Sequence, residues 1–255
     1  MSEKSIQVID RALDVLELLA TEKGGLGVTE IGHRLGLHKS TVHRILSAMA
    51  ERGYIEKASG SGMYKIGLKL VELSSVHLSN VELKTEARPY LWELTSKMNL
   101  TSHLAILDGV DAIYIEKVDV VSNIRLYSQI GRRIPVYCSA LGKSLLSGLP
   151  DGELGDTVAR CNFVKFTEKT LTDKNELISQ VRKVRLKGWS MDDEEHDEGI
   201  RCIAAPVFDY RGKVIAALSI SGPAAVVAAD KDGETAEFVK DAALKISGRM
   251  GYKCE

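Results

Sequence analysis

The stretch GLHKSTVHRIL, residues 36–46, decides the fold of the N-terminal part of the chain. Gly36 separates a short predicted helix, residues 29–35, from a longer one, residues 38–52. Apolar side chains recur at every third or fourth position of the longer helix from Val42 to Met49, a spacing that predicts one buried stripe. The opposite side of this helix is therefore expected to face solvent.

Elements predicted on both sides of this stretch complete a small domain. Upstream, residues 6–20 have the apolar spacing of an amphipathic helix, which ends at a group of glycines. Downstream, residues 54–57 and 63–66 predict two strands joined by a glycine-rich turn at 58–62. Helix, helix, turn, helix and hairpin is the order of a winged helix-turn-helix, which we assign to residues 1–67.

The exposed side of the helix at 38–52 has the composition of a DNA recognition helix, which presents short polar and basic side chains to the major groove. Residues 31–50 contain three Lys or Arg and no acid, although the whole chain has a formal net charge of -1. A solvated face of an ordinary helical bundle is the alternative, but the missing acids and the neighbouring hairpin favour DNA. We expect contacts with double-stranded operator DNA from Lys39, Ser40, Thr41, His43, Arg44, Ser47, Ser59, Ser61 and Lys65.

Composition indicates the broad class of protein. With 255 residues, 44% of them hydrophobic, and 34 Lys+Arg against 35 Asp+Glu, the chain is predicted to be globular, with one large or two ordinary domains. No apolar run approaches the roughly 20 residues of a membrane span, and no signal peptide is recognisable. The four cysteines are widely spaced and form no CxxC pair, so we expect neither disulfides nor a zinc finger, and a cytoplasmic location.

Two further segments follow the predicted N-terminal domain. Residues 68–98 have a broad apolar helical pattern, typical of a helix that contacts several neighbours such as a partner subunit, and Pro89 is expected to kink it or to start a new segment. In residues 99–255, strands are predicted at 102–107, 112–118, 124–128, 200–207 and 214–221, and helices at 139–147, 174–187 and 234–250. The predicted fold class is α+β, with a helical linker between the DNA-binding domain and an antiparallel sheet covered by helices.

Several stretches resemble the IclR family of bacterial transcription regulators. They are residues 36–46 quoted above, PVYCSALGK at 135–143, DDEE at 192–195, GIRCIAAPV at 199–207 and SISGP at 219–223. The resemblance extends over nearly the whole chain with matching spacing. It implies a GAF-like C-terminal domain that binds a small effector, and dimers that pair again into tetramers.

By matching positions, the resemblance also implies an effector pocket formed by Ala140, Leu141, Asp192, Cys202, Ser219 and Ser221, with an apolar wall of Leu126, Ile134 and Ile200. Backbone N–H groups at a helix N-terminus, as expected at Ala140, attract a carboxylate. Ser219 and Ser221 lie two apart on a predicted strand, so their side chains face the same side. Without the resemblance, a polar outer sheet face explains the two serines, and a small core residue explains Cys202.

A closer likeness concerns the ligand. YSQIGRR at 127–133, YCS at 137–139 and KISGRMGY at 245–252 are similar to the branch of the family that responds to sugar acids such as 2-keto-3-deoxygluconate. Arg132 and Arg133 suit an anionic ligand, although loop arginines are more often simply solvated. We expect a repressor of a sugar-acid catabolic operon, and the alternative is an activator that responds to an aromatic or other small carboxylate. No cofactor, metal or catalytic residue is expected.

An enzyme is the alternative from another class. GKS at 142–144 is typical of a phosphate-binding loop, but Tyr137 stands where the first glycine is required. Ser139 and Lys143 are four positions apart, which is not the SxxK spacing of acyl-transfer enzymes. The acidic segment 192–198, with His196, would suit a metal site in a sugar-acid-metabolising enzyme, but such a run of charges is more often a solvated turn.

Overall fold

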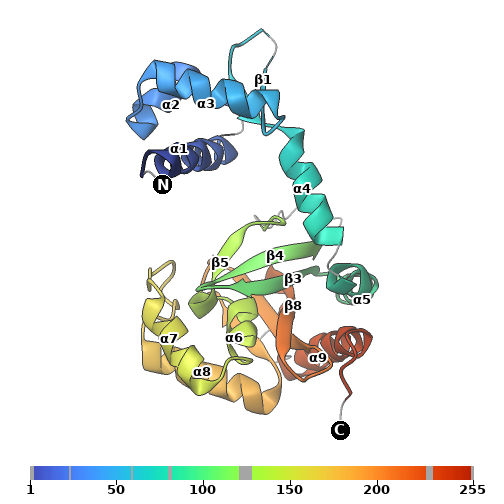
Figure 1. The fold of residues 1–255 in the computed structure, drawn as a ribbon. Helices are drawn as coiled ribbons and strands as arrows, with labels where there is room; N and C mark the ends of the chain where they lie inside the picture. Colours follow the sequence, from blue (N-terminus) through green and yellow to red (C-terminus); the bar gives the residue numbers. More distant parts are fainter. Residues whose placement is uncertain are drawn as a thin grey trace. The chain divides into compact units, whose positions relative to one another are not determined.

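In a computed structural model, the chain folds into two compact units, Met1–Asn80 and Val81–Glu255 (Figure 1). The structure describes residues 3–22, 24–58, 60–79, 82–120, 128–227 and 232–253. Each unit has its own buried core, and each is described by itself. Within the described ranges, the helices are too short or too polar to cross a membrane.

The helices of the first unit follow the predicted order. They are α1 (Glu3–Ala20), α2 (Val28–Leu35), α3 (Lys39–Glu51) and, after the hairpin, α4 (Leu68–Ser79). Gly36 ends α2 in the left-handed conformation, with φ 63°, and its N–H donates to the carbonyl oxygens of Gly32 and His33. Glycine adopts this conformation without a Cβ clash, so it allows the sharp turn between α2 and α3.

The predicted hairpin is also present. It pairs β1 (Ile55–Lys57) with β2 (Tyr64–Ile66) in an antiparallel register. Leu26, which precedes α2, forms an isolated bridge with Tyr64 and so connects the hairpin to the helices. Leu26 and Tyr64 are buried in one core with Leu46 of α3. This core covers one side of α3 and leaves the other side at the surface.

An antiparallel sheet forms the centre of the second unit. In spatial order, its described strands are β5 (Arg133–Pro135), β4 (Asp111–Val118), β3 (Thr101–Asp108), β8 (Val214–Pro223), β7 (Ile200–Phe208) and β6 (Ser190–Asp193). The sequence predicted β3, β4, β7 and β8, but not the short edge strands β5 and β6. Most of the strand predicted at 124–128 lies outside the described residues, and Ser128 itself is not in a strand.

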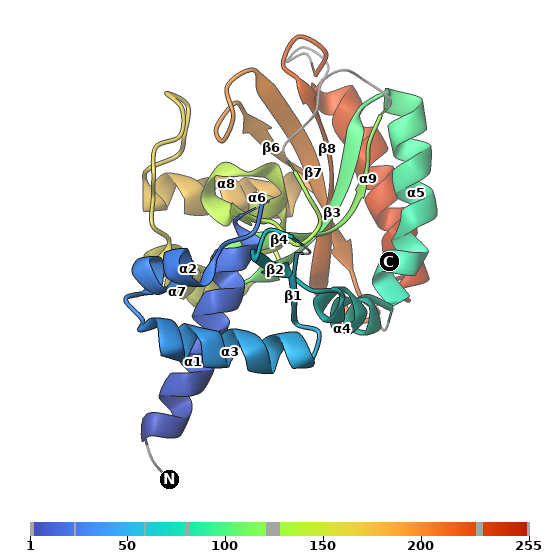
Figure 2. The same cartoon turned by 90° about the horizontal axis from the view of Figure 1, so that it is seen from above.

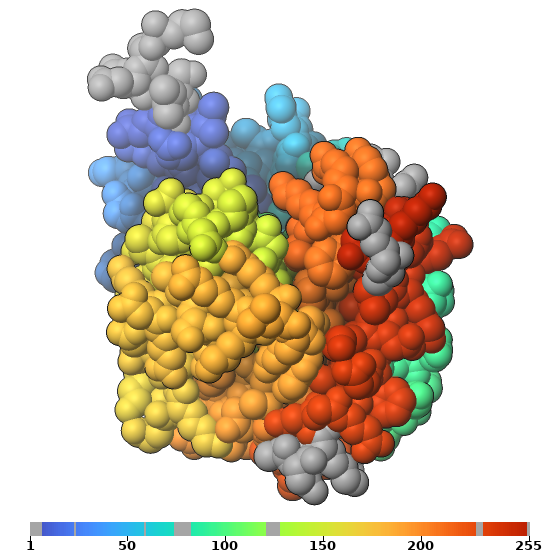
Figure 3. All heavy atoms as spheres, turned by 90° about the horizontal axis from the view of Figure 1, so that it is seen from below, coloured from blue at the N-terminus to red at the C-terminus, as the bar shows by residue number. Residues whose placement is uncertain are grey.

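Helices cover both faces of the sheet (Figure 2). On one face, α5 (Glu82–Met98) lies beside α9 (Asp232–Arg249). On the other face lie α6 (Ala140–Leu146) and α8 (Lys174–Lys187), with α7 (Asp151–Arg160) packed on α8. In the space-filling view, the yellow and light-orange surface over α7 and α8 lies beside the red surface over α9 (Figure 3).

Alternating side chains on the strands divide the core between the two faces. The side chains packed under α5 and α9 are large and apolar, among them Leu104 and Leu218. Most of the strand side chains packed under α6 are alanines, among them Ala105 and Ala217, with Tyr114 as a large exception. The α6 face is therefore less completely filled by its own side chains than the opposite face.

Pro89 does not start a new segment. The helix α5 continues from Glu82 to Met98 with Pro89 inside it. Proline removes one backbone hydrogen bond from a helix interior. Burial of Ala87 and Leu91 against the core of the second unit offsets this loss.

Candidate functional site

The helix α3 buries one side and exposes the other. Val42 and Leu46 are fully buried. The helix residues that we expect to contact DNA lie toward solvent, with Thr41 half-buried and the others exposed: Lys39, Ser40, Thr41, His43, Arg44 and Ser47. The structure thus gathers these side chains on one accessible surface, which we call the α3 surface.

Positive charge on the α3 surface is not neutralised by its surroundings. Lys39 and Arg44 form no ion pair with any residue that the structure describes. Arg34, in contrast, pairs with Glu22 at 2.6 Å and with Glu30 at 2.8 Å. Lys39 and Arg44 thus have no competing carboxylate partner among the described residues and can pair with a DNA phosphate.

Two of the hairpin residues that we expect to contact DNA have partners within the hairpin. Lys65 is exposed, but its Nζ lies 3.0 Å from a carboxylate oxygen of Glu56 on the paired strand. Ser61 is exposed in the turn, and its Oγ accepts a hydrogen bond from the N–H of Met63 at 3.4 Å. Ser59, the remaining hairpin residue expected to contact DNA, lies outside the described residues.

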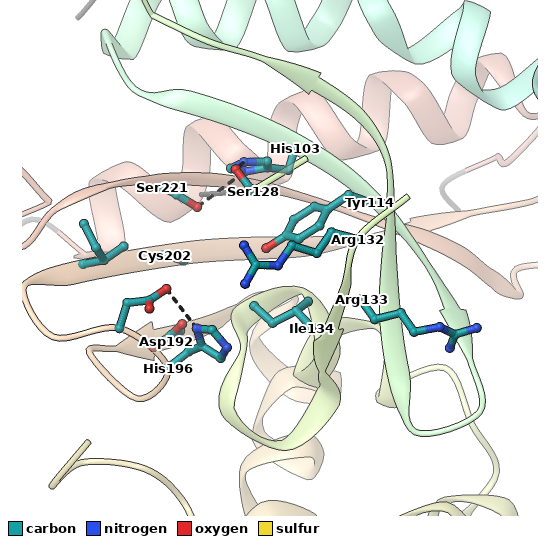
Figure 4. Close-up of a pocket in the computed structure, with 12 residues that line it drawn as sticks. His103, Tyr114, Ser128, Arg132, Arg133, Ile134, Asp192, His196, Cys202 and Ser221 are labelled. Carbon is teal, nitrogen blue, oxygen red and sulfur yellow. Dashed lines mark hydrogen bonds and ion pairs between the residues drawn. The ribbon is translucent and has the colours of Figure 1, made fainter. Parts of the chain in front are cut away.

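A cavity of about 190 Å³ lies on the α6 face of the sheet (Figure 4). Neighbouring strands form its floor: His103 from β3, Tyr114 from β4, Ser221 from β8, Cys202 from β7 and Asp192 from β6. Its other lining residues come from the sheet edge and from loops: Ser128, Arg132, Arg133, Ile134, His196, Asp197 and Ile200. We call this the effector cavity, because five residues expected to bind an effector line it.

Those five residues are Ile134, Asp192, Ile200, Cys202 and Ser221. Ala140, Leu141 and Ser219 are buried on the same face of the sheet but do not line the cavity. Ser219 Oγ has no hydrogen-bond partner among the described residues, so a polar group remains unsatisfied behind the cavity. Leu126 lies outside the described residues.

His103 is a central lining residue that sequence reasoning missed. Its Nε2 lies 2.7 Å from Ser128 Oγ, and its Nδ1 lies 3.5 Å from Ser221 Oγ (Figure 4). Burial lowers the pKa of His103 to about 3, so the imidazole is neutral at physiological pH. One ring nitrogen then donates and the other accepts, which makes His103 a polar link between the two serines. The available signal was a histidine beside the apolar run Leu104–Leu107 of a predicted strand.

Asp192 is the most buried carboxyl group of the effector cavity, with 3% of its surface exposed. Its Oδ1 accepts a hydrogen bond from the N–H of Glu195 at 2.7 Å. Burial, together with the negative charge of Glu195, raises the pKa of Asp192 to about 7. Burial likewise raises the pKa of Tyr114 and of the Cys202 thiol. At neutral pH the floor of the cavity therefore offers mainly uncharged hydrogen-bonding groups.

Two arginines lie at the edge of the effector cavity. Arg133 pairs with Asp108 and with Asp111, the latter at 3.5 Å. Backbone hydrogen bonds hold the preceding segment on β4: the N–H of Gly131 donates to Tyr114 O at 2.7 Å, and the N–H of Tyr114 donates to Arg132 O at 3.1 Å. These contacts place Arg132 at the cavity. The sequence alone did not establish whether Arg132 lies at the ligand site or is solvated in a loop.

Two protein-family models match the chain. Residues 8–59 match the IclR helix-turn-helix domain, and residues 75–248 match the model described as bacterial transcriptional regulator IclR, C-terminal. The chain belongs to the IclR family. Membership in the IclR family makes it a DNA-binding transcription regulator, as the resemblance implied, and not an enzyme.

Curated members of the IclR family match over nearly the full length. The chain is 36% identical to the transcriptional regulator XynR of Escherichia coli over 250 residues, which cover 97% of this chain and 98% of XynR. It is 38% identical to the transcriptional regulator KdgR of the same species over 248 residues, or 97% and 94% of the two chains. The transcriptional repressor AllR of Salmonella typhimurium is 32% identical over 252 residues, or 99% and 93%.

The fold also matches a solved IclR structure. The Thermotoga maritima IclR has a TM-score of 0.81 and 28% sequence identity, and the alignment covers 97% of this chain and all of that chain. The predicted α+β class, with an N-terminal helix-turn-helix and a C-terminal antiparallel sheet, is therefore confirmed.

The acidic segment 192–198 of this IclR-family chain is engaged in ion pairs and turn contacts. Asp193 pairs with Arg201 at 2.6 Å, and Glu194 pairs with Lys169 at 2.7 Å. In the parts of the chain that the structure describes, three or more His, Cys, Asp or Glu side chains do not gather as a metal site would require. The ion pairs of Asp193 and Glu194 hold this segment in place, while Asp192, His196 and Asp197 line the effector cavity.

Proposed function

We propose that this chain is a repressor of a sugar-acid catabolic operon, and that a small sugar acid or keto acid bound in the effector cavity lowers its affinity for operator DNA. The observation that carries the proposal is the convergence of His103, Tyr114, Asp192, Cys202 and Ser221 from neighbouring strands on one cavity. A hydroxylated acid has several donors and acceptors, which uncharged polar groups of this kind satisfy.

The proposed ligand orientation follows from charge. Arg132 lies at the edge of the cavity and suits a carboxylate, whereas the floor suits hydroxyl groups. Ile134 and Ile200 provide apolar contacts. The identity to KdgR over nearly the whole chain supports the sugar-acid branch, and the relation to the repressor AllR supports repression.

We keep three further residues in the proposed effector site, although they do not line the cavity itself: Ala140, Leu141 and Ser219. We call these three buried residues the inner layer. Ser219 Oγ lacks a partner among the described residues, and a ligand oxygen that reaches past Cys202 would satisfy it. The N–H groups of Ala140 and Leu141 belong to the first turn of α6, where helical N–H groups have no partner within the helix. A longer ligand would use this inner layer, and Leu126 would extend the apolar wall.

For DNA, we propose that two copies of α3 enter successive major grooves, about 34–36 Å apart, as in other helix-turn-helix dimers. The α3 surface supplies the contacts, with Arg44 and Lys39 as the charged ones, and Ser59, Ser61 and Lys65 of the hairpin contact the backbone. Exposed apolar side chains on α4, Leu68 at 77% and Val71 at 58%, support self-association into a dimer or tetramer. In this proposal residues 1–67 bind DNA and residues 99–255 bind the effector. Residues 68–98 form the helical linker between these two domains.

The effector must bind the two functional states unequally, because equal affinity would shift no equilibrium. The test is a thermal-shift screen of the purified protein against sugar acids, keto acids and aromatic acids, followed by operator titrations with each hit. Stabilisation by sugar or keto acids with weaker operator binding supports the proposal. Stabilisation by aromatic acids alone, with stronger operator binding, supports the activator alternative.

A further inference from the structure

A second cavity, of about 400 Å³, lies in the second unit and shares no lining residue with the effector cavity. It is bounded by α6, α8, β6 and the segment before α8. Three of its lining residues, Gln180, Lys183 and Lys187, lie on one side of α8 because they are three and four positions apart. This side of the helix is polar and basic, although it faces a hollow in the protein.

Lys143 of α6 supplies a buried ammonium group to this second cavity, with 1% of its surface exposed. Its Nζ donates to Glu195 Oε1 at 2.6 Å and to Gln180 Oε1 at 3.3 Å. An ammonium group has three N–H bonds, and the third finds no acceptor among the residues that the structure describes. One buried, charged donor is thus available to a ligand.

Lys183 and Lys187 add positive charge to the cavity, and neither forms an ion pair with a residue that the structure describes, although the charge of Asp232 acts on Lys187. Lys187 Nζ lies 3.5 Å from the centre of the Trp189 ring. Burial, and then the nearby charges of Lys143 and Lys183, lowers the pKa of Lys187, so the three ammonium groups repel one another. Like charges four positions apart on a helix destabilise it.

Of the three acids that line the second cavity, two form ion pairs, and Glu195 Oε2 is buried without a hydrogen-bond partner among the described residues. Asp193 pairs with Arg201 at 2.6 Å and with Lys169 at 3.2 Å. Glu195 pairs with Lys143. Glu176, the remaining acid of the lining, is exposed in the first turn of α8. The lysines of the cavity that form no ion pair with a described residue are Lys183 and Lys187, whereas the charge of Lys143 is paired with Glu195.

We propose that the second cavity binds a small metabolite that carries an oxyanion group, either a phosphate monoester or a polycarboxylate, with Lys143, Lys183 and Lys187 as its ligands. Such an anion accepts the free N–H of Lys143 and relieves the repulsion among the three lysines. A solvated helix face would explain Lys183 and Lys187 alone, but here they line one cavity together with the buried ammonium group of Lys143. The site shares no lining residue with the effector cavity, and the proposal does not depend on the sugar-acid ligand.

The experiment is isothermal titration calorimetry on the full-length protein with sodium phosphate, glycerol 3-phosphate and tricarballylate. The protein carries Arg44→Ala in every sample, so that anion binding on the α3 surface does not contribute. We expect glycerol 3-phosphate or tricarballylate to bind once per chain. The compound that binds with the higher affinity shows whether the natural ligand is a phosphate monoester or a polycarboxylate. Phosphate alone should bind more weakly, because it fills less of the cavity.

Variants show whether the anion that produces the calorimetric heat binds in the second cavity. Lys183→Gln with Lys187→Gln should weaken binding by roughly tenfold or more, since two charge-assisted hydrogen bonds are lost. Lys174→Gln removes a charge from the same helix outside the cavity and should change the affinity less than twofold. The proposal is overturned if none of the three anions binds, or if the Lys174 variant weakens binding as much as the double variant does.

Discussion

The backbone N–H of Glu195 donates to Asp192 Oδ1 at 2.7 Å, and this hydrogen bond joins two acids that line different cavities. Asp192 lies on the floor of the effector cavity, whereas Glu195 pairs with the buried Lys143 in the second cavity. The negative charge of Glu195 raises the pKa of Asp192, and Lys143 lowers it. A change in the charge of Glu195 or Lys143 in the second cavity therefore changes the pKa of Asp192 in the effector cavity.

The first prediction concerns pH and Asp192. Its pKa is about 7 in the folded protein and 3.8 for an isolated side chain, so the folded state binds more protons between these values. The free energy of unfolding should then fall as pH rises through this window. Asp192→Asn keeps an oxygen acceptor for the Glu195 N–H but does not titrate. Wild-type protein should lose stability relative to this variant between pH 5 and pH 8.

Urea unfolding followed by tryptophan fluorescence measures this difference. Both tryptophans, Trp92 and Trp189, belong to the second unit, so the signal reports that unit alone. Binding of an anionic effector should also weaken above pH 7 in the wild type but not in the variant, because ionised Asp192 repels it. Parallel pH profiles for the two proteins would show that Asp192 does not titrate in this range.

The second prediction concerns Arg44. Arg44→Ala should weaken operator binding by at least about tenfold, as expected for an arginine that reads a base or holds a phosphate, and should leave effector affinity unchanged. Fluorescence anisotropy with a labelled operator measures the loss. Arg34→Ala is the matched control, because Arg34 is a neighbouring arginine engaged with Glu22 and Glu30. Equal losses in both variants would remove Arg44 from the DNA contacts.

The third prediction concerns the serines of β8. Ser219→Ala combined with Ser221→Ala should weaken effector binding by roughly 1–3 kcal/mol, because ligand hydrogen bonds are not made. The single variants separate the inner layer from the cavity floor, with Ser221→Ala expected to have the larger effect. Calorimetry measures the affinities, and Ser179→Ala on the exposed side of α8 serves as the control. Unchanged affinity in the double variant would place the effector elsewhere.

The fourth prediction concerns the Lys143–Glu195 ion pair, whose side chains are 1% and 9% exposed. Lys143→Met should lower the free energy of unfolding by about 3–5 kcal/mol, because Glu195 is left buried without its partner. Adding Glu195→Met should restore much of this loss, since two apolar side chains replace the pair. If the double variant is no more stable than Lys143→Met, the pair itself stabilises the fold beyond the cost of an unpaired charge.

Much of the fold follows from local patterns in the sequence. The spacing from Val42 to Met49 fixes the buried side of α3, and Gly36 fixes the turn before it. The helix α8 spans the predicted residues 174–187, because Asp173 Oδ1 accepts the N–H of Glu176 at its start and Gly188 adopts a left-handed conformation at its end. Such features depend on residues close together in the chain.

The missed features depend on residues far apart in the chain. The edge strands β5 and β6 are short, and their sequences around Ile134 and Asp192 are not typical of strands, so only pairing with β4 and β7 defines them. His103 enters the site because β3 lies between β4 and β8. The pairing of Lys65 with Glu56 depends on the hairpin register. Local spacing does not encode these partners.

The most direct test of the account is an operator titration by fluorescence anisotropy, with and without a saturating sugar acid that stabilises the protein, using DNA from upstream of the gene that encodes the chain. We predict tight binding by the ligand-free protein, a clear loss of affinity with the acid, and a need for a higher concentration of the acid to produce that loss in the Ser219→Ala/Ser221→Ala variant. An acid that binds with a measurable heat yet leaves the operator affinity of the wild-type protein unchanged would contradict the account.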